Sequence, residues 1–174
     1  VTGVQTCALP ILNNNTIQLV GFGKEDVVEL LTLSEKKQIL NARMGCLEKL
    51  IEIVHCGNYN QFKNIIVTNM KDGLVYKYVD TVGQFKLATK SEAINHLVDC
   101  RFDDIQVIYN ELINYNKIDM KTKNLIEQFI NNFQNPNKKF YDMENKEYPS
   151  FKHYKINEVK ILLYNNQDTI TNDI

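Results

Sequence analysis

The spacing of apolar residues predicts helices over much of the chain. Leu47, Leu50, Ile51 and Val54 follow the i, i+3, i+4, i+7 pattern, which is typical of an amphipathic helix with one face against a core. This helix is expected over residues 44–56. Similar patterns and capping residues predict further helices over 24–31, after Thr32 or Ser34, and over 89–100, 103–114 and 119–134.

Polar residues that cap helix N-termini precede several of these segments. Thr32 and Thr89 each lie three residues before a glutamate, which is the spacing of a capping box. Asp103 and Asp119 are predicted to cap the helices that follow them. Asn135-Pro136-Asn137 is expected to end the last of these helices.

The period changes to that of strands between residues 64 and 88. A β-branched run over 64–69 is followed by the turn signal Asp72-Gly73, an alternating run over 74–79, a second turn and a last alternation to Leu87. A further short strand is expected over 17–20. The sequence therefore predicts a helix-rich α+β fold, in which a small antiparallel three-stranded meander over 64–88 packs against several helices. Those helices are expected to lie on a face of the sheet, because three strands alone are marginally stable.

The periodic spacing of apolar residues is weaker after residue 134. Residues 138–155 have no firm period, and residues 156–164 suit either a helix or a strand. We therefore expect an α+β domain over 17–134, an irregular extension over 135–164 that ends in a helix or strand, and a disordered tail over 165–174.

The first eleven residues resemble translated sequencing adapter. They read VTGVQTCALPI, carry no charge and lack the basic and long apolar regions of a secretory signal. We expect residues 1–11 to contribute nothing to the fold, residues 12–16 to be a linker, and the native protein to extend upstream of residue 12.

Composition narrows the class of protein. The net charge of −1 argues against a general nucleic-acid binder. The three cysteines other than Cys7 have no framework spacing, which favours a reducing, intracellular compartment over a disulfide-stapled secreted domain. No apolar stretch approaches the roughly 20 residues of a membrane span.

Three short motifs resemble an uncharacterised protein family of giant DNA viruses. They are Phe22-Gly23-Lys24-Glu25-Asp26, Ile53-Val54-His55, and the strand motif over 64–70 followed by Tyr76. Members of that family often carry a Cys2His2-like zinc finger and a coiled coil in front of this domain. The resemblance covers residues 17 to about 113 and implies a viral origin. It implies no reaction, and the finger would lie upstream of this fragment.

Several kinds of chemical site can be considered from residue types alone. Gly21-Phe22-Gly23 lies where a phosphate-binding turn would lie, but the third glycine is replaced by Asp26, so we expect only a tight turn. Six residues are of types that bind metals or act as nucleophiles, namely Cys46, His55, Cys56, His96, Cys100 and His153. No CxxC or HxxxH motif and no activating signature surrounds them. We therefore expect no bound metal, no cofactor and no catalysis. The adjacent carboxylates Asp103-Asp104 are interpreted as a helix cap and a first-turn residue that interacts favourably with the helix dipole.

A basic and aromatic segment is the one candidate for nucleic-acid contact. Lysines alternate with aromatic rings there, which could hold phosphates and stack bases. The alternative is that its rings pack on the core while its lysines face water. The segment has no arginine, so we expect weak binding at most. The candidate residues are Lys138, Lys139, Tyr141, Phe151, Lys152, Tyr154 and Lys155.

Two functions follow from these observations. The absence of a catalytic motif and the family resemblance favour a non-enzymatic interaction module with a protein partner. The alternative is a nucleic-acid-binding protein whose zinc finger is missing from this fragment.

Overall fold

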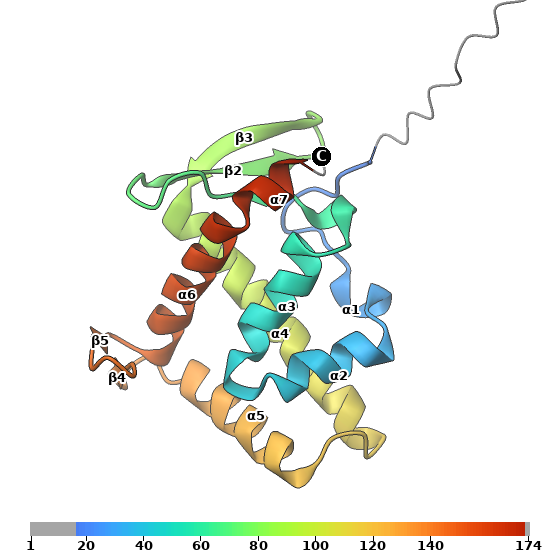
Figure 1. The fold of residues 1–174 in the computed structure, drawn as a ribbon, viewed down its shortest axis with the longest axis vertical. Helices are drawn as coiled ribbons and strands as arrows, with labels where there is room; N and C mark the ends of the chain where they lie inside the picture. The colour runs from blue at the N-terminus through green and yellow to red at the C-terminus, as the bar shows by residue number, and fades with distance from the viewer. Residues whose placement is uncertain (1–16, 173–174) are drawn as a thin grey trace, which may run out of the picture.

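The computed structural model describes residues 17–172 of the chain (Figure 1). The expectations for residues 1–11 and 12–16 lie outside the described residues. The predicted class is confirmed, since the described chain is a helix-rich α+β fold with a three-stranded antiparallel sheet. None of its helices is both long and apolar enough to cross a membrane.

The first half of the fold is a series of short helices. They are α1 (Val27–Leu30), α2 (Leu33–Asn41), the 3-10 turn η1 (Arg43–Gly45), α3 (Cys46–Ile51), the π-helical turn η2 (Glu52–Cys56) and the 3-10 turn η3 (Asn60–Phe62). The Thr32 capping box is confirmed, because its hydroxyl accepts from the Glu35 N–H at 3.2 Å while the Glu35 carboxylate accepts from the Thr32 N–H at 2.8 Å. The predicted apolar stripe is buried and runs from Leu47 in α3 to Val54 in η2.

The strand predicted over residues 17–20 is wrong. The Val20 N–H donates to the Gln61 carbonyl at 2.8 Å, and the Phe22 N–H donates to the Tyr78 carbonyl at 3.0 Å. Two isolated hydrogen bonds to different elements do not make a ladder, so this segment is an extended loop.

The predicted meander is confirmed. Strands β1 (Ile65–Ile66), β2 (Leu74–Val79) and β3 (Gln84–Thr89) pair antiparallel in the order β1-β2-β3. Tyr76 lies opposite Ile66 on one side and Leu87 on the other. The connection from β1 to β2 spans residues 67–73 and is longer than the tight turn that Asp72-Gly73 suggested.

A single helix replaces the two predicted over 89–114. Helix α4 (Lys90–Asn114) runs 25 residues without a break, and Asp103 is an exposed residue inside it rather than its cap. No glycine or proline interrupts the segment, and the buried stripe continues through Arg101, Phe102 and Ile105. The predicted capping box at Thr89 is also wrong, since its side chain makes no cap hydrogen bond. Thr89 is the last residue of β3, and its conformation is that of a strand.

The rest of the chain is more regular than predicted. Asp119 caps α5 (Met120–Phe133) by accepting from the Thr122 N–H at 2.8 Å, as expected. Strands β4 (Phe140–Tyr141) and β5 (Glu147–Tyr148) form a small hairpin, and α6 (Phe151–Asn165) follows. Residues 156–164 are therefore helical. The tail predicted to be disordered contains α7 (Gln167–Asn172), which contacts β1 and η2 and buries Ile170 completely.

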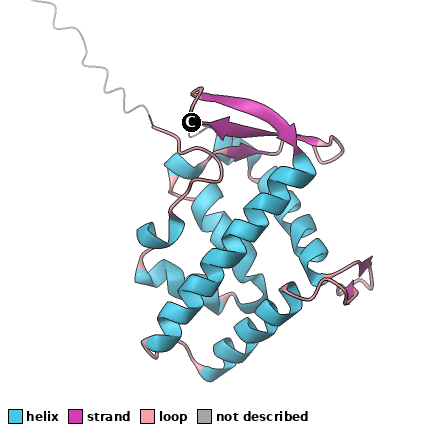
Figure 2. Ribbon diagram, turned by 180° about the vertical axis from the view of Figure 1, so that it is seen from behind, coloured by secondary structure: helices cyan, strands magenta, loops and turns pink. Residues whose placement is uncertain are grey.

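One hydrophobic core joins all these helices. Helix α4 crosses the molecule from the sheet to the opposite end, and α3 and α6 both pack against it (Figure 2). The helices pack mainly on one another, while the sheet covers one end of the bundle. The expectation that the helices lie together on a face of the sheet is therefore wrong, since the main helix contacts of its strands are made by α4 and α7. Phe151, Val159 and Leu163 of α6 belong to the same core cluster as Leu47 and Ile105.

Candidate functional site

The basic and aromatic candidates do not share one surface. Phe151 is 4% exposed, and its ring lies edge-on to Phe129 and Phe140 at centroid distances of 5.7 and 5.1 Å. Lys155 is also 4% exposed. Its ammonium donates to the Glu48 carboxylate at 2.7 Å and to the Met44 carbonyl at 2.6 Å. These two residues hold α6 in the core and are not available to nucleic acid.

Most of the remaining candidates are paired with carboxylates. Lys152 lies 2.5 Å from Asp99, and Lys139 lies 2.8 Å from Glu147. The Tyr141 hydroxyl donates to Glu147 at 2.6 Å. The other two candidates are Tyr154, which is half-buried, and Lys138, which is exposed. The segment therefore presents little unpaired positive charge to a phosphate backbone.

The cysteine and histidine candidates are either buried or not activated. Burial raises the pKa of the Cys46 thiol and raises that of Cys56 to about 12. Cys100 Sγ lies 3.7 Å from His96 Nε2, so one predicted pair is brought together. Its thiol pKa is nevertheless raised, by burial first, which disfavours the nucleophilic thiolate. Within residues 17–172, no three or more His, Cys, Asp or Glu side chains are grouped to hold a metal ion.

The Gly21–Gly23 turn is a tight turn, as predicted. Gly23 has a φ of +85°, and a Cβ there would lie 2.6 Å from His96 Nε2. The Gly23 N–H donates to both oxygens of the Glu25 carboxylate, each at 3.1 Å. Glu25 therefore occupies the amide that a bound phosphate would need.

Glu25 also belongs to a buried polar cluster that the sequence analysis missed. Asn64 Nδ2 donates to Glu25 at 2.6 Å, and the Arg101 guanidinium lies 3.6 Å from the same carboxylate. His55 is fully buried, and its Nδ1 lies 2.8 Å from the Phe62 carbonyl oxygen. Arg101 Nε and Asp104 Oδ2 are 3.0 Å apart as an ion pair, although the N–H does not point well enough for a hydrogen bond.

The electrostatics of this cluster fit a structural role. Burial alone would raise the pKa of Glu25, but the neighbouring His55, a backbone hydrogen bond and Arg101 lower it overall. Burial lowers the pKa of His55. The only signal in the sequence was an arginine within the apolar stripe of a helix. The cluster pins the loop before α1 to α4.

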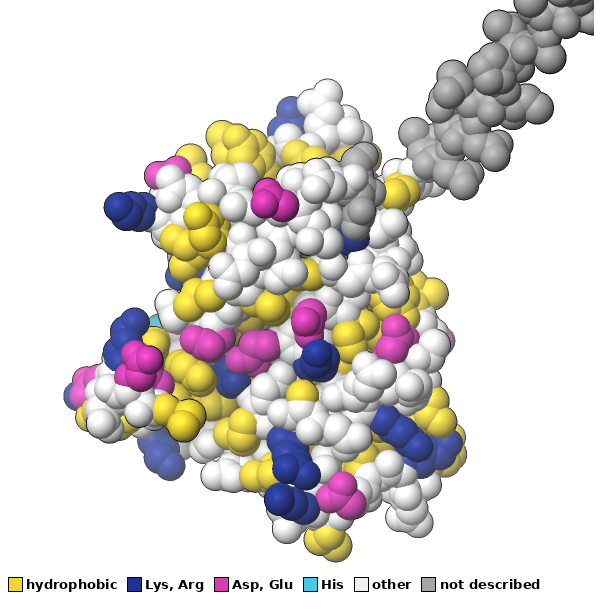
Figure 3. All heavy atoms as spheres, in the orientation of Figure 1, with side chains coloured by type: hydrophobic (Ala, Val, Ile, Leu, Met, Phe, Trp, Pro, Cys, Tyr) yellow, Lys and Arg dark blue, Asp and Glu magenta, His cyan; other side chains and the backbone are white. Residues whose placement is uncertain are grey.

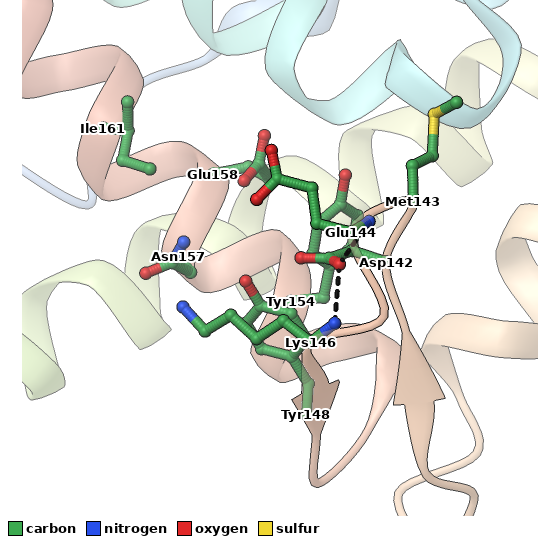
Figure 4. Close-up of a pocket in the computed structure, with 9 residues that line it drawn as sticks. All are labelled: Asp142, Met143, Glu144, Lys146, Tyr148, Tyr154, Asn157, Glu158 and Ile161. Carbon is green, nitrogen blue, oxygen red and sulfur yellow. Dashed lines mark hydrogen bonds between the residues drawn. The ribbon is translucent and has the colours of Figure 1, made fainter.

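An open pocket lies between the β4–β5 hairpin and α6. We call it the hairpin pocket; its volume is about 390 Å³, and its lining side chains come from both elements (Figure 4). The Asp142 carboxylate accepts from the N–H groups of Glu144 and Lys146, each at 2.9 Å, which shapes the turn. The lining residues are Asp142, Met143, Glu144, Lys146, Tyr148, Tyr154, Asn157, Glu158 and Ile161.

Two tyrosines form the aromatic wall of the hairpin pocket. The rings of Tyr148 and Tyr154 meet edge to face, with centroids 5.3 Å apart and planes at 68°. The Lys146 ammonium lies 5.0 Å from the centroid of the Tyr148 ring. The pKa of Tyr154 is raised, by burial first and then by nearby carboxylates that include Glu158 and Asp142. The pocket thus combines aromatic faces with negative potential.

The hairpin pocket was not predicted from the sequence, because the lysines and aromatic rings of this segment suggested only contact with nucleic acid. The signal that could have found it is the run of acids between them, Asp142, Glu144 and Glu147. The partners Asn157 and Glu158 lie on α6, and only the fold brings them opposite the hairpin.

Comparisons of the chain with known protein families, curated proteins and solved structures found no match.

Proposed function

We propose that this chain is a non-enzymatic interaction module and that the hairpin pocket is its binding site for a protein partner. The observation that carries the proposal is Tyr148, which is 8% exposed yet lines an open pocket. Its hydroxyl makes no hydrogen bond with any residue in the described part of the chain, and it is not sealed from solvent. Such a group offers a ready hydrogen bond to a ligand.

The character of the pocket favours binding over catalysis. Asp142 and Glu158 are half-buried and Glu144 is exposed, so all three carboxylates keep contact with water. Solvated carboxylates are suited to ion pairing with a cationic group of a ligand. No cysteine, serine or histidine lines the pocket, so it has no usual nucleophile next to a base.

The biological setting is also a proposal. The resemblance of residues 17 to about 113 to a giant-virus family supports a viral origin and a location in the host cytoplasm or the virion. The described cysteines Cys46, Cys56 and Cys100 are all free thiols, which agrees with a reducing compartment. The partner would then be a viral or host protein.

Amide chemical shifts of the full chain labelled with ¹⁵N test this proposal. The protein would be titrated with pooled hexapeptides, one pool each of basic, acidic, neutral polar and apolar composition. We expect at least one pool to shift amides of residues 142–148 and 154–161. If no pool moves those amides, the hairpin pocket is not a peptide-binding site and the proposal fails.

Nucleic-acid binding is the competing function, and the same spectra test it. Single-stranded and duplex oligonucleotides at physiological salt should leave the amides of residues 138–155 in place, because the lysines there are mostly paired. Shifts confined to that segment, with submicromolar affinity, would replace our proposal by the competing one.

A further inference from the structure

The hairpin pocket carries an excess of negative charge. Three carboxylates line it, those of Asp142, Glu144 and Glu158, against the single lysine Lys146, which gives a formal charge of −3 + 1 = −2. None of the three forms an ion pair with any residue between 17 and 172. Figure 3 shows both acidic and basic side chains on the hairpin, and further acidic side chains beside it. The pocket therefore attracts cations and repels phosphate.

The aromatic wall is already used to hold a cation. The Lys146 ammonium over the Tyr148 ring, at 5.0 Å, lies within the range of a cation–π interaction. Lys146 is exposed and forms no ion pair with the described residues, so it can move aside. The ring that it covers, with its unbonded hydroxyl, is suited to an ammonium or guanidinium group from outside the chain.

The size and the apolar lining point to one long side chain. Ligand pockets commonly span about 300–1,000 Å³, so about 390 Å³ is at the small end of the range. Met143 and Ile161 add apolar surface beside the carboxylates. A lysine or arginine side chain has the matching form, with an aliphatic stem and a charged head. A bare metal ion would not use this apolar surface, and no metal-binding group of side chains is found in the described part of the chain.

From these contacts we infer that the hairpin pocket binds a lysine or arginine side chain presented by a basic segment of a protein partner. This inference rests on the proposed function of the pocket as a partner-binding site. The charged head lies between Glu144 and Glu158, and the stem lies along Tyr148 and Ile161. Because charge provides much of the attraction, binding weakens as salt rises.

Matched peptides test the inference. The full ¹⁵N-labelled chain would be titrated with acetylated, amidated Gly-Ser-Xaa-Ser-Gly, where Xaa is lysine, arginine, norleucine or glutamate. The lysine and arginine peptides should shift amides of residues 142–148 and 154–161, with Kd at least about fivefold below that of norleucine. Glu158→Gln and Glu144→Gln should each raise Kd about two- to fivefold. Glu29→Gln, an exposed acid on α1 far from the hairpin in Figure 1, makes the same charge change and should leave Kd unaltered.

Lys146→Ala gives a test in the opposite direction. Removing the internal cation should free the Tyr148 ring and lower Kd for the lysine peptide about two- to fivefold. A purely structural role for Lys146 predicts no such gain.

The outcomes separate the inference from the proposed function. If the norleucine or glutamate peptide shifts the pocket amides with an equal Kd, the pocket binds a partner but the inference is wrong. Equal Kd for Glu29→Gln and for the two pocket variants would also overturn it. If neither these peptides nor the hexapeptide pools shift any pocket amide, both the inference and the proposed function fail.

Discussion

The Lys155 ammonium of α6 lies 2.7 Å from the Glu48 carboxylate of α3, although the two residues are 107 positions apart. Lys155 is almost completely buried, and the Glu48 side chain is 22% exposed. Lys155 also donates to the Met44 carbonyl, so one ammonium joins α6 to the segment that begins α3. The residue is a structural link between two neighbouring helices that are far apart in the sequence.

Replacing Lys155 with methionine should therefore destabilise the fold. The substitution keeps the aliphatic stem but leaves Glu48 without its partner, and breaking a pair of this kind costs about 3 kcal/mol. Urea unfolding followed by circular dichroism measures the loss. Lys138→Met, at an exposed position, is the control and should stay within about 0.5 kcal/mol of wild type. Equal losses for the two variants would contradict the structural role.

Phe151 gives a parallel comparison among the aromatic candidates. Phe151→Ala removes a ring that packs against Phe129 and Phe140, and it should lower the free energy of unfolding by about 3 kcal/mol. Tyr141→Ala, on the exposed side of the hairpin, should cost about 0.5 kcal/mol or less. Thermal or urea unfolding tests both variants. A stable Phe151→Ala protein would show that α6 is not part of the core.

Gly23 should not tolerate a side chain. Its φ of +85° is unfavourable for alanine, and the added Cβ would meet His96 at 2.6 Å, so Gly23→Ala should cost about 1–3 kcal/mol. Gly45→Ala is the matched control, because nothing lies within 4 Å of its Cβ position. That control should be neutral or slightly stabilising by urea unfolding. If both alanines cost the same, the close approach of the turn to α4 is wrong.

Asp104 should make stability depend on pH. Burial raises the pKa of Asp104 from 3.8 to about 6, against the opposing effect of Arg101. Between these values the folded state binds more protons than the unfolded chain, so this contribution to stability is lost as pH rises through about 6. The amide side chain of the Asp104→Asn variant does not titrate. Going from about pH 4.5 to about pH 7.5, wild type should therefore lose on the order of 1–2 kcal/mol relative to Asp104→Asn.

Urea unfolding at the two pH values measures this difference. The comparison with a variant is needed because His55, whose pKa is lowered by burial, acts in the opposite direction. It favours folding as pH rises, and it does so in wild type and variant alike. A pH-independent difference between wild type and Asp104→Asn would argue against a buried, titrating carboxyl.

Local signals in the sequence were sufficient for much of the fold. The stripe from Leu47 to Val54 and the capping box at Thr32 depend on residues within two turns of one another, so both could be predicted. The prediction that Asp103 caps a helix was wrong because an aspartate, which often caps helices, can also lie on the exposed face inside a longer helix. No local sequence pattern distinguishes a cap position from an exposed position inside a helix.

Contacts between distant segments could not be predicted. Ile170 is buried only because α7 reaches β1 and η2, and Lys155 is neutralised only because α3 lies beside α6. The hairpin pocket has the same origin. Tyr148 and Glu158 line one pocket because a short hairpin folds back over α6. The residues of the hairpin have no regular apolar period from which this arrangement could be predicted.

The unbroken course of α4 has a consequence for how the molecule unfolds. Its partners come from both halves of the chain, namely α1, α2, α3 and the sheet on one side of the sequence and α5 and α6 on the other. A helix with no hinge cannot release one set of partners without exposing its own buried stripe to water. The described chain should therefore melt as one cooperative unit, with its slowest-exchanging amide hydrogens along α4.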